Sequence, residues 1–377
     1  MRLRNSLPLA FALLILGTQV AHSAGDSDTT TVVPLTTSTS STLLTSSTQM
    51  ALVKTITGAI TPKSVRSSKY GIVSAQNMMY RHSITIYSSK TFALLKTVPD
   101  TVQLSAFGLK GYSGEYQGAP VEAAYSPDGK YLYVTNYSMY GKGFDREGHD
   151  TCSPSSNFDK SFLYRINLSN YKVDAVYQVG VVPKVVEVTP DNKYILVSNW
   201  CSYDVKVISV SSQKVVKTIP IGAYPRGITV SSNSKIAYVA QMGGSVIHRI
   251  KLSDLSSSAF YIGSNPRALV LSPDNKTLYA TLNSSGKVIS YDLVHGKILS
   301  SLTTGKQARS LAISTDGSAL FVVNYESGSV SKVNTAGLKL VQSLYACNHP
   351  IGVTFDESTS RTWVACYHGQ IKIFDNL

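Results

Sequence analysis

Short runs of β-branched and aromatic residues alternate with turn-forming residues along most of the chain. One unit contains the runs Lys214–Ile219, Pro225–Val230, Ile236–Ala240 and Val246–Ile250, each bounded by Gly, Pro, Ser or Asn. Runs of this length and composition predict β-strands. The last three runs are strands a, b and c of one small antiparallel sheet, and the first is strand d of the sheet before it.

This unit repeats about every forty residues. Its a–b turn has a recognisable motif, Ser126-Pro127-Asp128-Gly129-Lys130 in one copy and Thr189-Pro190-Asp191-Asn192-Lys193 in another. Gly and Asn suit such tight turns because they tolerate positive φ. The turns are anchored at Asp128, Asp191, Asn233, Asp274, Asp316 and Ser358, with a weaker anchor near Ser67. Seven repeats of this period predict an all-β, seven-bladed β-propeller of four-stranded blades.

The two ends of the repeat region complement each other. The last blade ends after its strand c, Gln370–Phe374, while Leu52–Ile56 has the pattern of a strand d with no earlier blade to join. We expect this N-terminal strand to complete the last blade and close the ring, which would protect an exposed edge. The propeller is therefore assigned to residues 50–377.

One strand b reads Tyr133-Val134-Thr135-Asn136, and the chain thereby resembles the YVTN β-propeller repeat family over about residues 50 to 377. The resemblance implies a seven-bladed ring in a secreted, periplasmic or surface-layer protein. It implies little chemistry, because few members of that family have an assigned activity. The chain departs from the motif where Gln241, Leu282 and Cys366 replace the final Asn.

The N-terminal residues have a different composition. Arg2 and Arg4 precede an apolar run from Leu7 to Leu16, and small residues follow up to Ala24. This pattern predicts a secretory signal peptide over residues 1–24, with an uncleaved anchor as the alternative, although the run is short for a membrane span. Residues 25–49 are rich in Ser and Thr and predict a linker or surface tether, with glycosylation an open option. We therefore expect a secreted, periplasmic or cell-surface protein with no membrane span after cleavage, and a monomer.

The chain is strongly basic. Its formal net charge is +13, and removal of Arg2 and Arg4 with the signal peptide would leave +11. Such an excess favours anionic partners, and the candidates are cell-wall polymers, acidic glycans, anionic lipid surfaces and nucleic acid. Nucleic acid is disfavoured by export. The alternative is that scattered surface Lys residues only keep the protein soluble, since no run of consecutive basic residues occurs.

Two repeats carry insertions of about twenty residues, a length that marks functional loops rather than ordinary connections. One, roughly Pro99 to Gly118, joins strands d and a, and the other, roughly Tyr137 to Lys160, joins strands b and c. Both connections emerge at the same end of the ring, which we call the top and which insertions mark as the working face. The four cysteines map to the top as well. We predict the disulfides Cys152–Cys201 and Cys347–Cys366, with free or metal-binding thiols as the alternative.

Four successive blades carry a cation at the start of strand a, the innermost strand. Seven residues before each turn anchor stand Lys184, Arg226, Arg267 and Arg309, and the aligned residues of two other blades are Val121 and Ile351. Gathered like charges are costly without an anion, and Arg suits carboxylate or phosphate. We predict a ligand site at the top mouth of the channel. The alternative is a set of clamps between blades, in which each cation pairs with a neighbouring backbone carbonyl or acid. Glu122 and Glu187 are near enough in sequence to pair with Lys184 in this way.

Further candidates lie at the same end. The amides that end strand b could contact a ligand or cap their own loops: Asn136, Asn199, Gln241 and Asn324. His349 and His368 flank one cysteine pair and are candidates for a divalent metal, although their spacing matches no known metal motif. No other cofactor is predicted. Aromatic residues enrich the insertions and suit a glycan or protein surface, or loop packing: Tyr112, Tyr116, Tyr137, Tyr140 and Phe144.

These features favour an exported, non-enzymatic binding or scaffold protein that recognises an anionic small molecule, a glycan or a protein through its top face. Motifs of serine hydrolases, zinc proteases, phosphate-binding loops and haem attachment are absent from the sequence. The alternative is a propeller enzyme of the lactonase or lyase type. In that case Glu122, Glu187 and His349 are the candidate catalytic residues, with a metal or an acid–base pair at the channel mouth.

Overall fold

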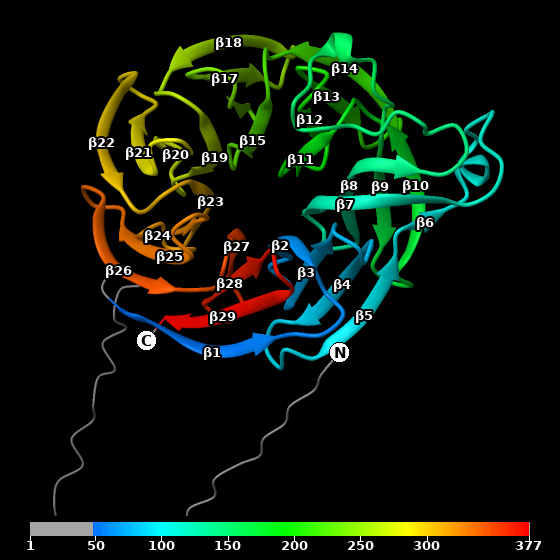
Figure 1. Cartoon of the computed structure of the whole chain (residues 1–377). Coiled ribbons are helices and arrows are strands. Elements are labelled where there is room, and N and C mark those ends of the chain that lie inside the picture. Colours follow the sequence, from blue (N-terminus) through cyan, green and yellow to red (C-terminus); the bar gives the residue numbers. More distant parts are fainter. Residues whose placement is uncertain (1–47, 377) are drawn as a thin grey trace, which may run out of the picture. The chain divides into compact units, whose positions relative to one another are not determined.

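The computed structural model describes residues 48–376, which form a closed ring of seven antiparallel sheets around a central axis (Figure 1). The predicted seven-bladed β-propeller is confirmed. The predicted signal peptide and nearly all of the linker lie outside the described residues.

Each blade is a meander whose strand a lies innermost. In blade 2 strand a is β7 (Tyr116–Tyr125), and the additional short strand β6 (Thr101–Val102) pairs with the first residues of β7. Blades 1 to 3 are built from β2 (Pro62–Ser67), β3 (Ile72–Asn77), β4 (Ser83–Ser88) and β5 (Leu94–Pro99); β6 (Thr101–Val102), β7 (Tyr116–Tyr125), β8 (Tyr131–Tyr140), β9 (Phe162–Asn167) and β10 (Lys172–Gln178); and β11 (Pro183–Val188), β12 (Tyr194–Asn199), β13 (Asp204–Ser209) and β14 (Lys214–Pro220). Blades 4 to 6 are built from β15 (Pro225–Val230), β16 (Ile236–Gln241), β17 (Val246–Lys251) and β18 (Ser256–Tyr261); β19 (Pro266–Leu271), β20 (Thr277–Leu282), β21 (Lys287–Asp292) and β22 (Lys297–Thr303); and β23 (Ala308–Ile313), β24 (Ala319–Asn324), β25 (Ser329–Asn334) and β26 (Lys339–Tyr345). Apolar clusters between neighbouring blades form the core, as where the Phe321 and Phe355 rings stack at 5.4 Å.

Blade 7 is completed by the N-terminal strand, as predicted. It contains β27 (Pro350–Asp356), β28 (Arg361–Cys366) and β29 (Gln370–Asn376), and β1 (Met50–Ile56) pairs antiparallel with β29 as its outer strand. The buried Lys332 of blade 6 fastens this closure, since its ammonium donates hydrogen bonds to the carbonyl of Thr48 at 2.7 Å and to Asn376 Oδ1 at 3.1 Å. Both ends of the repeat region are therefore tied to one neighbouring blade.

The recurring turn motif forms one hydrogen-bond network at the bottom of the ring. Ser126 Oγ donates to Asp128 Oδ1 at 2.6 Å and accepts the N–H of Tyr131 at 2.9 Å, while Asp128 Oδ1 accepts the N–H of Lys130 at 3.2 Å. The network recurs at Thr189/Asp191, Ser231/Asn233, Ser272/Asp274 and Ser314/Asp316. The motif is thus a structural device that closes the a–b turn from within its own blade.

The turn anchor near Ser67 was wrong. Strand β2 continues through Ser67, and Ser68 takes the place of Ser126, because its Oγ accepts the N–H of Ile72 at 3.3 Å. The turn of blade 1 is shorter than the others and lacks the Asp, which hid the correct alignment. The corrected alignment adds Lys63 to the positions at the channel mouth.

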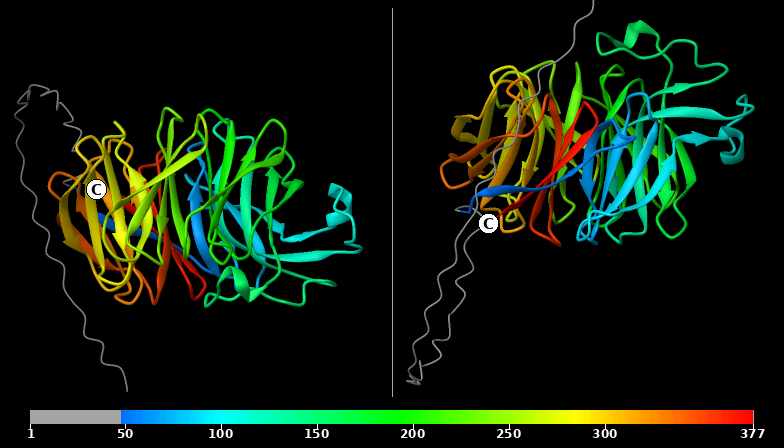
Figure 2. Two further views of the ribbon diagram at one scale, coloured as in Figure 1. Left: turned by 90° about the horizontal axis from the view of Figure 1, so that it is seen from above. Right: turned by 60° about the horizontal axis from the view of Figure 1, so that its bottom comes forward.

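Blade 2 carries a lobe made from the inserted residues, which projects beyond the outer edge of the ring (Figure 2). The predicted bounds of the two insertions implied that they are loops throughout. In the structure they are partly strand, because β7 begins at Tyr116 and β8 runs to Tyr140. Short 3₁₀ helices, η1 (Leu104–Phe107) and η2 (Pro154–Ser156), lie in them. The rings of Tyr112, Tyr116 and Phe144 pack against each other and cover Phe162, so these aromatics form a small core of the lobe.

Across the described residues, the structure contains no helix of the length and apolarity needed to cross a bilayer.

Candidate functional site

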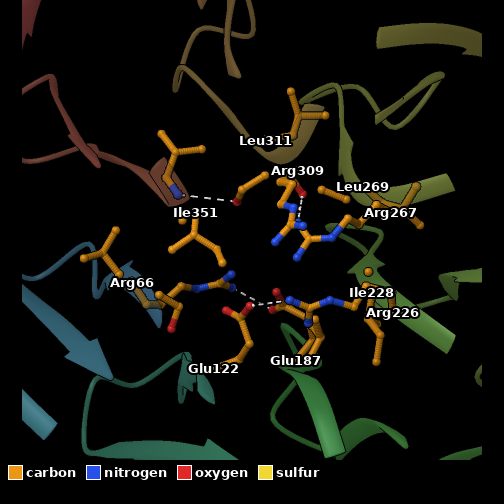
Figure 3. A pocket seen from close by; sticks show the side chains of 18 residues that line it. Arg66, Glu122, Glu187, Arg226, Ile228, Arg267, Leu269, Arg309, Leu311 and Ile351 are labelled. Carbon is orange, nitrogen blue, oxygen red and sulfur yellow. Dashed lines mark hydrogen bonds and ion pairs between the residues drawn. The ribbon is translucent and has the colours of Figure 1, made fainter. Parts of the chain in front are cut away.

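A small cavity of about 100 Å³ lies on the ring axis and is lined by residues of the innermost strands (Figure 3). The top end of strand a is marked in six blades by its second residue, just after the one that pairs with the last position of strand b. In blade 2 the equivalent residue is Val121, which follows Pro120, the partner of Asn136, within the longer β7. Five of the seven blades carry a cation at this position, which we call the mouth ring: Lys63, Lys184, Arg226, Arg267 and Arg309. The predicted four cations are therefore brought together, and Lys63 joins them.

Acidic residues neutralise part of this charge. Arg226 Nη2 lies 3.1 Å from Glu122 Oε1, and Lys184 Nζ lies 2.7 Å from Asp150 Oδ1. Deeper in the channel, Arg66 Nη2 lies 2.7 Å from Glu187 Oε2 (Figure 3). The alternative in which Glu122 or Glu187 pairs with Lys184 is not what the structure contains. The partner of Lys184 is Asp150 of the second insertion, whose path over blade 3 no local pattern encodes.

The other three cations of the mouth ring have no carboxylate within ion-pair distance among residues 48–376. Arg267 donates a hydrogen bond to the carbonyl oxygen of Arg309 in the next blade, which is the clamp that the sequence left open for this residue. Arg309 donates to Gln307 Oε1 at 2.9 Å, and its guanidinium lies 3.6 Å from the centre of the Tyr325 ring. Two buried donors, Arg226 Nη1 and Arg309 Nε, have no hydrogen-bond partner in the described part of the chain.

Burial and mutual repulsion make this charge costly. Lys184, Arg226 and Arg267 are between 5% and 7% exposed. Burial, followed by the repulsion of Arg226 and Arg309, lowers the pKa of Arg267 well below its usual range. Burial lowers the pKa of Lys184 to about 8, with Asp150 opposing the shift and Arg226 adding to it. A bound anion would offset this cost, since an opposite charge nearby favours the charged form of each base.

Both predicted disulfides are present, Cys152–Cys201 and Cys347–Cys366. The first fastens the second insertion over blade 3, where the carbonyl of Asp150 also accepts the indole N–H of Trp200 at 2.9 Å and the carbonyl of Cys152 accepts the hydroxyl of Tyr203 at 2.9 Å. These contacts hold the Asp150 carboxylate against Lys184. The disulfide therefore positions one wall of the site.

The amides predicted as ligand contacts lie inside their own blades. Asn136, Asn199 and Asn324 have no exposed surface. Asn199 Oδ1 accepts the N–H of Gly180 at 2.9 Å, and Asn324 Nδ2 donates to Ser331 Oγ at 3.0 Å. Gln241 Oε1 lies 3.3 Å from His248 Nε2. These amides therefore lie where residues that cap their own loops would lie. Loop capping was the alternative role that the sequence analysis gave for them.

Two of the three candidate catalytic residues, Glu122 and Glu187, line the same cavity (Figure 3), whereas His349 is not part of its lining. Burial raises the pKa of Glu187, with Arg66 opposing the shift and the charge of Glu122 adding to it. Glu122 and Glu187 are held by different arginines, and the ring of His349 stacks on Tyr325 with centroids 4.3 Å apart. His368 stacks on His349 at 5.5 Å. Among residues 48–376, no group of three His, Cys, Asp or Glu side chains is arranged to hold a metal.

Sequence reasoning missed Lys63, Asp150 and Arg66 as parts of this site. Lys63 follows Pro62 as Lys184 follows Pro183, so alignment on the proline instead of the weak turn would have found it. Asp150 reaches the mouth only because a disulfide folds its loop there. Arg66 lies deeper in the channel, three positions after Lys63 on strand β2. No other blade has a cation at the equivalent position, so the repeat alignment does not single it out.

Comparisons with known proteins agree on the propeller. Residues 266–370 match the sequence model of the family described as "Cytochrome D1 heme domain". Antigen Lp49 of Leptospira interrogans serogroup Icterohaemorrhagiae serovar copenhageni (strain Fiocruz L1-130) is 28% identical over 176 residues, covering 43% of this chain and 36% of the antigen. The chain therefore spans about a third of the length of this curated relative. The solved structure of Kuenenia stuttgartiensis hydrazine synthase superposes with a TM-score of 0.65 at 15% identity, covering 84% of this chain and 96% of that one.

Because the description of the matched family names haem, we asked whether the residues of the site could hold a haem. Haem iron is held by His, Cys, Met or Tyr side chains, and none of these types lines the cavity. The cavity of about 100 Å³ is also small beside the roughly 300–1,000 Å³ of pockets for cofactors and drug-sized ligands. The residues at the mouth ring therefore do not fit a haem. The comparisons support the propeller fold without assigning its ligand.

Proposed function

We propose that the protein binds a small anionic molecule, or the anionic end group of a larger one, at the mouth ring of its propeller. One observation carries the proposal: three cations of the ring have no acidic partner among the described residues, and two buried guanidinium donors are unpaired. Buried donors without partners are rare because each costs roughly 1–3 kcal/mol. An anion on the ring axis would satisfy them.

The composition and size of the cavity favour a compact carboxylate or phosphate. Arg226, Arg267 and Arg309 present planar donors that suit such groups, and the volume of about 100 Å³ leaves room for few atoms besides the charged group. A larger ligand would extend over the top rim, where the Trp200 and Tyr224 rings stack at 4.5 Å on one side. Tyr325 and His349 form a second aromatic surface on the other side.

The proposed location is the cell envelope or the extracellular space. Two disulfides favour an oxidising compartment, in agreement with the signal peptide predicted over residues 1–24. The strong positive charge would attract anionic ligands there by electrostatic steering.

Calorimetric titration tests the proposal. The full chain is titrated with pyruvate, gluconate, inorganic phosphate and an acidic oligosaccharide at one fixed ionic strength, with chloride as the reference anion. We expect saturable binding of at least one probe, and weaker binding above pH 8, because Lys184 then loses its charge. Absence of saturable binding by every probe would overturn the proposal.

A further inference from the structure

The mouth ring is asymmetric around the axis. Blades 3 to 6 contribute a continuous arc of cations, Lys184, Arg226, Arg267 and Arg309, which we call the cationic arc. Blades 7 and 2 contribute Ile351 and Val121, which are 3% and 0% exposed. Lys63 of blade 1 stands between these two apolar side chains, on the opposite side of the ring from the arc. It is the one mouth-ring cation whose neighbours on both sides are hydrocarbon.

Lys63 also lacks a partner that would hold its proton. In the part of the chain that the structure describes, no hydrogen bond or ion pair engages its ammonium, which lies 5.3 Å from the centre of the Tyr367 ring. Asp150 interacts electrostatically with Lys63, but its carboxylate forms an ion pair with Lys184, with Oδ1 2.7 Å from Lys184 Nζ. Burial, followed by the charges of Lys184, Arg226, Arg267 and Arg309, lowers the pKa of Lys63 well below its usual range.

These surroundings are those of a nucleophilic amine. A lysine becomes reactive when it is desolvated or placed beside other cations, because a fraction of it is then unprotonated at neutral pH. The cationic arc would meanwhile hold the carboxylate of a ligand on the far side of the mouth. Ser64, the residue after Lys63, lines the cavity, so a carbonyl group that extends from that carboxylate across the mouth would approach Lys63.

We propose that Lys63 captures small oxo acids, carboxylates that carry an aldehyde or ketone, as a covalent imine, with the arginines of the cationic arc holding the carboxylate. This inference rests on the proposed anion site and names its ligand class. The unprotonated Nζ attacks the carbonyl carbon and forms a C–N bond. The two protons lost by nitrogen pass to the former carbonyl oxygen, whose C–O bond breaks as it leaves as water. The C=N bond remains, and the step requires no oxidant or reductant.

Lys184 provides the comparison within the same ring. Its ammonium is held by Asp150 at 2.7 Å and lies 4.2 Å from the centre of the Tyr137 ring. An amine fixed in an ion pair keeps its proton more firmly and cannot turn toward a carbonyl group. We therefore expect capture at Lys63 and not at Lys184.

Reductive trapping tests the inference. The full chain is incubated with pyruvate or glyoxylate, treated with cyanoborohydride, and digested for peptide mass spectrometry. We expect one dominant adduct on Lys63. Lys63→Arg, which keeps the charge, should lose that adduct, whereas Lys217→Arg, on the exposed outer strand β14, should retain it. Adducts spread over surface lysines, or unchanged in amount in Lys63→Arg, would overturn the inference.

A parallel titration with lactate separates this inference from the proposed function, because lactate has the carboxylate without the carbonyl group. Lactate binding together with no Lys63 adduct from pyruvate would overturn the covalent step and leave the anion site standing. Failure of both lactate and pyruvate to bind would overturn both. Melting curves of each variant establish that it is folded.

Discussion

The two ends of the same innermost strands differ in how their polar groups are satisfied. At the bottom, the side chains of Ser126 and Asp128 bond to each other and to the backbone of their own turn, and four other blades repeat the arrangement. At the top, the mouth ring gathers cations from five blades, and two of its buried donors have no partner within residues 48–376. The bottom therefore has what a stable blade needs, while the top carries charge that the fold alone does not require.

The difference shows how to separate structural from functional repetition. Residues that recur in a repeat because each blade needs them are satisfied within that blade. The cations of the mouth ring recur too, yet Arg226 reaches Glu122 two blades away and Lys184 reaches an insertion. Repetition that converges on one axis and leaves charge unpaired indicates a shared ligand.

The largest expected effect concerns the covalent links, which occur only at the top of the described structure. Cys152→Ser/Cys201→Ser should lower the free energy of unfolding by about 4 kcal/mol, and Cys347→Ser/Cys366→Ser by about 3 kcal/mol, because the closed loops differ in length. The sequence separations are 49 and 19. Urea denaturation measures both values. An equal or reversed order would show that loop closure is not what these disulfides contribute.

The next effect concerns the cationic arc. Arg226→Ala/Arg267→Ala should weaken binding of the best anionic probe about 100-fold, because each hydrogen bond to a charged group contributes roughly 1.5–3 kcal/mol. Lys217→Ala removes one charge from the exposed outer strand β14 and serves as the control, with affinity nearly unchanged. Calorimetry provides the comparison. Similar losses in both variants would mean that net charge, and not the mouth ring, attracts the anion.

A third prediction tests whether every unpaired group on the top side serves the ligand. Asp100 follows β5 and is fully buried, with no partner for either carboxylate oxygen in the described structure. Burial raises the pKa of Asp100 well above its usual range. The folded protein thus binds this proton more tightly than the unfolded chain, and the stabilisation is lost as pH rises from about 4, the ordinary pKa of Asp.

Asp100→Asn should therefore stabilise the protein at pH 7 by on the order of 1–3 kcal/mol and change it little at pH 4. The new amide would also give a donor to Asn136 Oδ1, which is unpaired in the described residues and lies, like Asp100, beside Gly118. Urea denaturation from pH 4 to pH 8 tests this prediction, with anion affinity as the second readout. A variant that is less stable at pH 7, or that loses anion binding, would refute it.

The smallest effect belongs to the bottom of the ring. Asp191→Ala should cost about 1 kcal/mol of stability through the loss of its turn hydrogen bonds, namely those with Thr189 Oγ1 at 2.6 Å and the N–H of Lys193 at 3.1 Å. Anion affinity should stay unchanged. A change in affinity would remove the distinction between the two ends.

The fold was predictable because each repeat carries its own turn chemistry and strand pattern. The blade count, the closing strand and both disulfide pairings followed from periodicity and from which connections share an end of the ring. Four cations of the mouth ring followed from the same alignment. Lys63 did not, because a shortened turn at Ser68 shifted the alignment of blade 1. The role of Asp150 was beyond local patterns, since tertiary contacts and the Cys152–Cys201 bond decide where its loop lies.

The most direct test of the account is a pair of melting curves for the full chain and for Arg267→Met, each with and without pyruvate at constant ionic strength. Arg267 is a buried cation without an acidic partner in the described structure, and Met has a similar length without the charge. If the mouth ring exists to bind an anion, the variant without ligand unfolds at the same or a higher temperature than the parent, and pyruvate no longer raises that temperature. A variant that unfolds at a lower temperature and still responds to pyruvate would show that Arg267 is a clamp between blades, and would contradict the account.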